Sequence, residues 1–304
     1  PPRSTQSRSS AASDVYKRQG IILAGGSGSR LYPMTAIFSK QLQVIYDKPM
    51  IYYPLATLML ADIKDILIIS TPEDTPNYQK LLKNGSQWGI NLTYKIQKKP
   101  RGIAEAFIIG KEFIDKQQVC LILGDNIFYG KLDFLRNAIK QNTGGTIFGY
   151  HVNNPKDYGV VEFDAKWNVI SIEEKPENPK SNYAIPGLYI FNSEVTAIAK
   201  KIKPSKRGEL EITDIQKEYL KKNQLKVEII GRGVAWLDTG TPENLIEAGS
   251  FIHAIEKRQG YKVACLEEIA LNKNFITKKQ YIKIVNQLPN CSYKNYCLNI
   301  LKQK

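Results

Sequence analysis

Hydrophobic residues in the first half of the chain alternate between short continuous runs and longer, helically spaced stripes. The short runs predict buried β-strands, and stripes with apolar residues three or four positions apart predict helices. The predicted strands are 21–24, 65–70, 92–97, 119–125 and 146–152, and the predicted helices are 50–61, 75–85, 103–114 and 132–142. Strands that alternate with helices indicate an α/β fold, with a mostly parallel sheet covered by helices.

The pattern becomes richer in strands after residue 152. Strands are predicted at 159–164, 169–175, 184–191 and 226–231, helices at 193–202, 211–223 and 242–258, and amphipathic helices over 265–304. We therefore expect a Rossmann-like mixed, mostly parallel sheet with a β-rich part. One domain should span 20–260, and a C-terminal helical extension, 261–304, should pack on it.

Residues 1–19 share nothing with the periodic sequence that follows them. They contain no apolar segment of the kind that a secretory signal requires. We predict that this segment is a non-native leader and that it is disordered.

The formal net charge is +14. Residues 1–19 contribute +3 and the lysine-rich stretch 273–304 contributes +7, so the rest of the chain carries about +4 with both signs interspersed. A basic tail of this kind is typical of a solvated surface, and we expect no binding to nucleic acid. The sequence contains no apolar run long enough for a transmembrane helix, so no membrane association is expected.

The chain has four cysteines, Cys120, Cys265, Cys291 and Cys297, without a CxxC spacing. In a chain of this length that pattern does not indicate a disulfide framework or a zinc site. It predicts buried thiols in a reducing compartment.

The first predicted strand leads into the stretch LAGGSGSR, which contains Gly25, Gly26 and Gly28. Glycines allow the backbone to come close to a ligand, and exposed amide groups suit a phosphate. Arg30 adds a permanent cation. A Rossmann fingerprint would need glycine at the position of Leu31, and the Gly-Lys-Ser/Thr of a P-loop is also missing. The glycines alone leave a simple strand-to-helix turn equally possible.

The full pattern, Gly-Gly-x-Gly-x-Arg-Leu-x-Pro-x-Thr followed by Lys40, resembles the signature of the sugar-1-phosphate nucleotidylyltransferases. Six further stretches resemble motifs of glucose-1-phosphate thymidylyltransferases in the same order, over about residues 20 to 300: DKPMIYYPLATLMLA, LGDNIFYG, YGVVEFD, EEKPENPKSNYA, PSKRGELEITD and GRGVAWLDTGT. The resemblance implies transfer of a thymidylyl group from dTTP to α-D-glucose 1-phosphate, giving dTDP-glucose and pyrophosphate. That reaction opens dTDP-deoxysugar synthesis, dTDP-rhamnose included. A cytoplasmic homotetramer that uses Mg²⁺, with the β-rich part binding the sugar, is also implied.

The implied reaction needs positioning and charge neutralisation rather than a general base, because a phosphomonoester is already ionised near neutral pH. Arg30 and Lys40 are our candidates for neutralising the triphosphate, and Lys175 for holding the sugar phosphate. Asp125 and Asp238 each follow an apolar run, and the resemblance assigns both to the metal ion. Without the resemblance, either carboxylate could be an ordinary turn or cap residue.

Base choice is expected from Gln97 and Gly102, which the resemblance places against thymine. Uracil presents the same polar edge, so we also expect activity with UTP. Arg101 and Glu105 depart from the usual pattern beside this loop. The resemblance assigns further ligand contacts to Gly25, Gly26, Gly28, Gln41, Asn126, Tyr158, Gly159 and Glu174.

Two other functions remain open from the sequence. The first is the same chemistry with another base or sugar, such as a uridylyltransferase. The second is a non-catalytic regulatory homologue, which would be expected to lose Arg30, Asp125, Lys175 or Asp238; all four are present.

Overall fold

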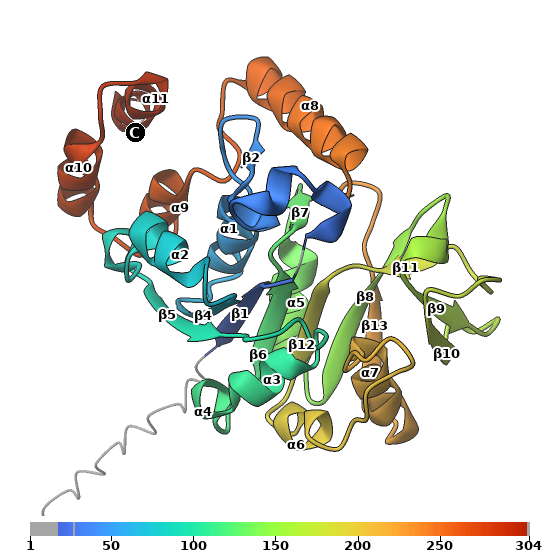
Figure 1. Ribbon diagram of the computed structural model, residues 1–304. Helices are drawn as coiled ribbons and strands as arrows, with labels where there is room; N and C mark the ends of the chain where they lie inside the picture. Colours follow the sequence, from blue (N-terminus) through green and yellow to red (C-terminus); the bar gives the residue numbers. More distant parts are fainter. Residues whose placement is uncertain (1–17, 27, 303–304) are drawn as a thin grey trace, which may run out of the picture.

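A central ten-stranded sheet forms the core of the protein in the computed structural model, which describes residues 18–26 and 28–302 (Figure 1). The strand order is β10-β9-β11-β8-β12-β6-β1-β4-β5, with β13 beside β8. The strands are β1 (Gln19–Ala24), β4 (Asp65–Ser70), β5 (Asn91–Ile96), β6 (Val119–Leu123), β8 (Gly145–His151), β9 (Gly159–Phe163), β10 (Val169–Glu174), β11 (Tyr183–Ile185), β12 (Leu188–Phe191) and β13 (Leu225–Ile229).

Strand direction confirms the α/β class expected from the sequence. Strands β5, β4, β1 and β6 pair in parallel, β12 runs against both β6 and β8, and β13 is parallel to β8. Following the pairings, β10, β11 and β12 oppose the other seven described strands. The sheet is therefore mixed and mostly parallel, with its antiparallel part in the second half of the chain.

Alternate residues of the central strands enter two separate hydrophobic clusters, one on each face of the sheet. In β1, Ile22 packs into one cluster and Ile21 into the other, and both are fully buried. Helices cover both faces: α1 (Tyr52–Leu60), α2 (Thr75–Leu82), α3 (Glu105–Ile109), α4 (Lys111–Ile114), α5 (Asp133–Gln141), α6 (Val195–Ala199), α7 (Ile212–Lys221) and α8 (Pro242–Gln259).

The segment 103–114, predicted as one helix, is divided at Gly110 into α3 and α4. The backbone of Gly110 leaves the helical region, and a Cβ there would lie 2.9 Å from the Ala106 carbonyl oxygen and 3.1 Å from Ile21. The predicted helix is thus divided at a glycine that packs closely on β1.

The chain ends in three helices, α9 (Leu266–Asn272), α10 (Lys278–Gln287) and α11 (Ser292–Lys302), grouped beside α1 and α2 in Figure 1. Helix α9 packs on α1 and on the 3₁₀ turn η4 (Ser86–Trp88). The predicted helical stretch over 265–304 is thus confirmed for its described residues. The domain boundaries themselves stay a prediction.

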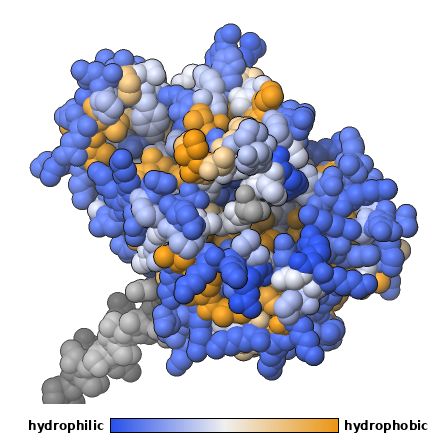
Figure 2. All heavy atoms as spheres, viewed as in Figure 1, coloured by the Kyte–Doolittle hydropathy of each residue, from blue (hydrophilic) through white to orange (hydrophobic). Residues whose placement is uncertain are grey.

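The segment 1–19, which was predicted to be disordered, differs from that prediction at its last residue. Gln19 is the first residue of β1, and its side-chain amide donates to the Phe113 carbonyl at 2.5 Å. The prediction of disorder for 1–19 is therefore wrong at Gln19, while 1–17 lie outside the described residues. No described helix combines the length and the hydropathy that crossing a membrane requires. The face of the molecule drawn in Figure 2 is largely hydrophilic, with apolar side chains in smaller groups.

Candidate active site

A cavity of about 250 Å³ opens where β1 and β6 end. It lies at the carboxyl ends of the parallel strands, where open α/β sheets bind their ligands. Its walls contain eight of the residues that the sequence singled out: Arg30, Asp125, Asn126, Tyr158, Gly159, Glu174, Lys175 and Asp238. The structure thus brings together side chains from widely separated motifs.

Asp125 and Asp238 are brought together by a small second sheet. Strand β7 (Asn126–Tyr129) pairs with β14 (Ala235–Asp238), and the register sets Asp238 opposite Asn126. Thr239 closes this end of the ladder, because its amide and its hydroxyl both donate to the Asp125 carbonyl, at 3.2 and 2.8 Å. The two carboxylates therefore share the mouth of the cavity.

The two carboxyl groups have opposite pKa shifts. Burial would raise the pKa of Asp125, but the Lys40 ammonium, which pairs with it, and the Asn126 amide outweigh burial and lower that pKa. Burial and the neighbouring Asp125 raise the pKa of Asp238 to about 6, against the opposing charges of Lys40 and Arg30. The site therefore carries a repulsion between carboxylates that a bound cation would relieve.

Asn126 holds Asp125 in place. Its side-chain oxygen accepts from the Trp236 indole at 2.7 Å and from the Gly187 amide at 2.9 Å, and its amide nitrogen donates to Asp125 at 3.1 Å. Only one amide hydrogen is left over by these bonds. The sugar contact expected for Asn126 is thus limited to that hydrogen, and positioning Asp125 is its principal contact in the structure.

The opposite wall of the cavity is built by β9 and β10. Lys175 follows β10 with φ of +45°, a conformation that is uncommon for a residue with a side chain, and its amide donates to the Tyr158 carbonyl at 3.0 Å. Such outliers cluster at functional sites. Tyr158 packs edge-on against Trp236 with ring centroids 5.0 Å apart.

Glu174 lies beside Lys175 among further charges. Burial and the nearby Glu211 raise the pKa of the Glu174 carboxyl, and Arg207 partly offsets them. A Cβ at Gly159 would lie 3.4 Å from the Glu174 carboxylate, so this glycine keeps the wall open in front of Glu174.

The sequence analysis gave no role to Arg207, Glu211 and Gln216, which are among the other residues that line the same cavity. Arg207 donates to both oxygens of Glu211, at 3.0 and 2.8 Å, and approaches Glu174 at 4.0 Å. Gln216 is fully buried, and both polar atoms of its amide lack a hydrogen-bond partner among the described residues. The motif PSKRGELEITD was noticed, but its individual side chains were not assigned roles.

Two glycines of the loop after β1 have backbone conformations that favour glycine. Gly26 has φ of +107° with open space beside it, and Gly28 has φ of +58° with the Thr35 hydroxyl donating to its carbonyl at 2.9 Å. Arg30 follows in a 3₁₀ turn and reaches Gly240, where a Cβ would lie 2.9 Å from its guanidinium. The loop is thus joined to the Asp238 side of the cavity through Arg30.

Gln97 lies directly beside the glycine loop. A Cβ on Gly25 would lie 2.6 Å from its side-chain oxygen, so a larger residue there would displace this oxygen. The amide nitrogen of Gln97 donates to Glu105 at 2.9 Å and approaches the Gly102 carbonyl at 3.4 Å. Glu105 therefore fixes the amide with its oxygen, an acceptor, toward the loop.

Gln41 lies differently from the other candidates. It is buried, its Cγ sits 2.8 Å from where a Cβ of Gly124 would be, and the Tyr78 hydroxyl is 3.5 Å from its side-chain oxygen. It supports the strand end beneath Asp125 and is not among the residues that line the cavity.

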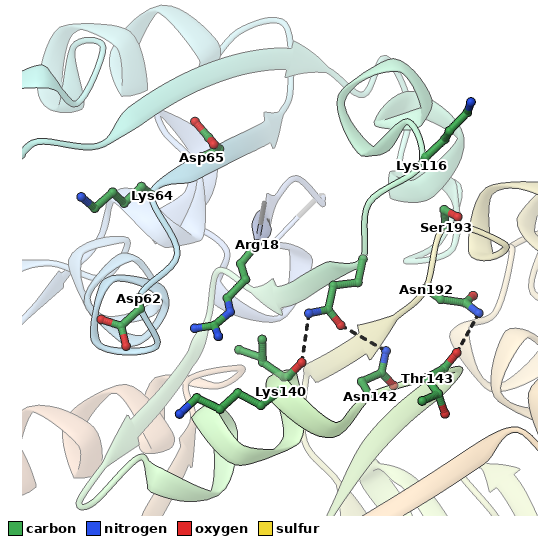
Figure 3. Close-up of a pocket in the computed structure, with 12 residues that line it drawn as sticks. Arg18, Asp62, Lys64, Asp65, Lys116, Lys140, Asn142, Thr143, Asn192 and Ser193 are labelled. Atoms are coloured by element: carbon green, nitrogen blue, oxygen red, sulfur yellow. Dashed lines mark hydrogen bonds between the residues drawn. The ribbon is translucent and has the colours of Figure 1, made fainter. Parts of the chain in front are cut away.

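A larger hollow, of about 970 Å³, lies at the opposite ends of the strands, around the amino ends of β1, β4 and β6 (Figure 3). Its polar groups bond to one another: Gln118 donates to the Ile139 carbonyl at 2.9 Å, and Asn192 to the Thr143 carbonyl at 3.1 Å. The lysine at 116 points away from its centre in the figure. None of the residues predicted for the site lines this hollow.

Comparison with known proteins matches this arrangement to one family. The family model described as nucleotidyl transferase matches residues 19–255. The chain belongs to the nucleotidyl transferase family. Residues 19–255 include both small-sheet strands and every candidate of the cavity.

Curated relatives narrow the assignment. The chain is 53% identical over 285 residues to a glucose-1-phosphate thymidylyltransferase from Neisseria gonorrhoeae, covering 93% of this chain and 99% of that protein. It is 49% identical over 286 residues to the enzyme of the same name from Mycobacterium tuberculosis, covering 94% and 99%. By these relatives it falls among the glucose-1-phosphate thymidylyltransferases of the family.

Solved structures agree with the fold. A crystal structure described as a glucose-1-phosphate thymidylyltransferase from Bacillus anthracis, in complex with sucrose, matches with a TM-score of 0.72 and 39% identity, over 77% of this chain and 94% of that one. A UDP-glucose pyrophosphorylase matches with a TM-score of 0.69 at 23% identity, over 80% of this chain and 99% of that one, and shows the shared fold alone.

Proposed function

We propose that this protein transfers a thymidylyl group from dTTP to α-D-glucose 1-phosphate, giving dTDP-glucose and releasing pyrophosphate. The observation that carries the proposal is the single cavity that unites Arg30, Asp125, Lys175 and Asp238. Near-full-length relatives at about 50% identity support this activity over the uridylyltransferase and regulatory alternatives.

Arg30 and Lys40 neutralise the triphosphate in this proposal. Arg30 stands between the glycine loop and Asp238, close to Gly240. Lys40 pairs with Asp125 and so stands at the edge of the same cavity. Fixed cations near the reacting phosphate stabilise the charge that develops there, and loss of one such group typically costs about 100-fold in rate or more.

The residues present fit a Mg²⁺ ion. Asp125 and Asp238 supply hard carboxylate oxygens. Burial and the repulsion from Asp125 raise the pKa of Asp238 to about 6, and a divalent cation would offset both. When bound, Mg²⁺ neutralises phosphate oxygens and orients the triphosphate. Asn126 and Thr239 hold the backbone and side chain of Asp125 in the position this role requires.

Lys175 holds the attacking phosphate of glucose 1-phosphate, and Glu174 accepts from the sugar hydroxyls. Arg207 and Gln216 join them, because both line the wall opposite Asp238. The unpartnered amide of Gln216 suits a sugar hydroxyl, which both donates and accepts. Catalysis then consists of holding the two anions for in-line attack.

Gln97 reads the base through its side-chain oxygen, which accepts the N3–H that thymine and uracil share. The backbone of Gly102, whose missing side chain leaves room for Leu210, lies beside Gln97 and contributes to the same base site. Gly25, Gly26 and Gly28 present backbone amides to the phosphates. Because a methyl contact is worth only about 10-fold or somewhat more, we expect dTTP to be preferred and UTP to be used.

Pyrophosphate release with glucose 1-phosphate, Mg²⁺ and each of dTTP, UTP, CTP, ATP and GTP tests the proposal. We expect turnover with dTTP and weaker turnover with UTP. A preference for UTP would assign a uridylyltransferase, and a folded protein inactive with all five would support the regulatory alternative. We also expect a homotetramer, a cytoplasmic location and a role in dTDP-deoxysugar synthesis. These three expectations rest on the family resemblance alone.

A further inference from the structure

Two cysteines that are distant in sequence meet inside the C-terminal helices. Cys265, just before α9, and Cys297, in α11, are 1% and 0% exposed, and their sulfur atoms are 3.8 Å apart. Glu267, also buried, has a carboxylate oxygen 3.9 Å from the Cys265 sulfur. One donor atom from each of the three side chains lies within 4.8 Å of the others.

The carboxylate in this cluster has only neutral partners among the described residues. The Trp88 indole donates to one oxygen of Glu267 at 3.1 Å, and the Tyr293 hydroxyl donates to the other at 2.5 Å. The ammonium of Lys262 faces the Tyr293 ring at 5.9 Å, but it pairs with Asp47 and Glu256. Buried charges are normally paired with an opposite charge or bound to a metal ion.

We propose that Cys265, Cys297 and Glu267 bind a zinc-type divalent cation that joins α9 to α11. Thiolate and carboxylate are ordinary zinc ligands, and ligands about 2.3 Å from a tetrahedral centre are about 3.8 Å apart, the separation of these sulfur atoms. A disulfide bond is about 2.05 Å long, so the two cysteines are free thiols in the structure and both can serve as ligands.

The surroundings complete the site. The Trp88 indole donates to the oxygen of Glu267 that lies away from Cys265, and this bond orients the carboxylate. Metal-binding side chains are commonly oriented by such a hydrogen bond. The Tyr293 hydroxyl, beside the other oxygen, is available as the fourth donor or as a second such partner. Binding would release the thiol protons, since zinc binds the thiolate form. The ion would fasten the C-terminal helices to each other and, through Trp88, to the main domain.

The test is metal analysis of the full-length protein after zinc-supplemented expression and removal of loosely bound metal. We expect about one zinc per chain, falling below about a tenth in Cys265→Ser and in Cys297→Ser. Two other substitutions are the matched controls and should keep the metal. Cys291→Ser removes an exposed thiol, and Cys120→Ser removes a buried thiol of β6. Zinc that persists in the Cys265→Ser/Cys297→Ser double variant would be an adventitious ion only and would overturn the proposal.

A second measurement needs no variant, so it holds even if a substituted protein fails to fold. Refolding the wild-type chain with Co²⁺ should give the near-ultraviolet charge-transfer absorption of cobalt bound to thiolates. All four thiols should then react with a thiol reagent in denaturant with a chelator. Two missing thiols without metal would show a disulfide, and four thiols with no cobalt spectrum would show ordinary buried cysteines; either result overturns the proposal. Neither readout depends on nucleotidyl transfer.

Discussion

Replacing Asp238 by asparagine should make the metal-free protein more stable while it abolishes most of the activity. The variant keeps the shape of the side chain and removes its charge. In the structure that charge is penalised, because burial and the neighbouring Asp125 raise the pKa of Asp238 to about 6. A binding site whose ligands repel one another before the cation arrives is destabilising on its own.

The size of the effect follows from the shift. A carboxyl whose pKa rises from 3.8 unfolded to about 6 folded binds more protons in the folded state, so stability falls as the pH rises between those values. Below pH 3.8 the penalty is absent, and above about pH 6 it is complete. About two pKa units correspond to about 3 kcal/mol at pH 8, and to about 1 kcal/mol at pH 4.5. Asparagine should remove this penalty, which is an upper bound for so coupled a pair of carboxyls.

The assay is chemical denaturation of both proteins in Mg²⁺-free buffer at pH 8 and pH 4.5, beside the rate of pyrophosphate release at pH 8. The variant should gain stability at pH 8 and progressively less at lower pH, while its kcat/KM falls by about 100-fold or more. Asp157→Asn, at an exposed carboxylate of the same cavity, is the control and should change stability by less than about 0.5 kcal/mol. A stability difference independent of pH, or a loss at pH 8, would refute the electrostatic account of this site.

Three further substitutions test other contacts of the cavity. Gly240→Ala should displace the guanidinium of Arg30, 2.9 Å from the added Cβ, and lower kcat/KM about 10-fold in a steady-state assay. Glu105→Leu should free the Gln97 amide and raise the KM for dTTP about 10-fold, whereas Glu105→Gln should keep the hydrogen bond; equal KM values in both would contradict the orienting role. Gln216→Leu should raise the KM for glucose 1-phosphate about 3- to 10-fold and stabilise the free protein by about 1 kcal/mol in thermal unfolding, and an unchanged KM would remove Gln216 from the sugar site.

The parts of the fold that could be predicted are those coded by local periodicity. The apolar run at 21–24 predicts a buried strand, and the glycines after it predict the loop in which the strand ends. The structure has β1 and a glycine loop at these positions. The helix predicted over 103–114 is divided at Gly110, a glycine that lies close to Ile21 of β1, a contact distant in sequence. Local patterns carry no information about such contacts.

The candidate site shows the same division. Glycine, arginine and aspartate residues at predicted strand ends can be recognised as site candidates from the sequence. Gln216 lies in the middle of a helical pattern, where it is indistinguishable from an ordinary polar residue. Cys265 and Cys297 were interpreted as buried thiols because their spacing matches no metal motif, yet the packing of α9 and α11 makes them neighbours. Cys291 is exposed, so the expectation of a buried thiol was wrong there.

The charges of the cavity explain why the site stays folded before any ligand binds. Two carboxylates at one sheet edge would repel strongly, but Lys40 pairs with Asp125 and leaves the excess charge on Asp238 alone. On the opposite wall Arg207 does the same for Glu211 and Glu174. Asp125 and Glu211 are therefore each paired with a cation of the cavity, whereas Asp238 keeps its raised pKa. In the proposed reaction Lys40 also neutralises the triphosphate, so substrate binding exchanges its ion pair with Asp125 for an ion pair with phosphate and frees that carboxylate for a metal ion.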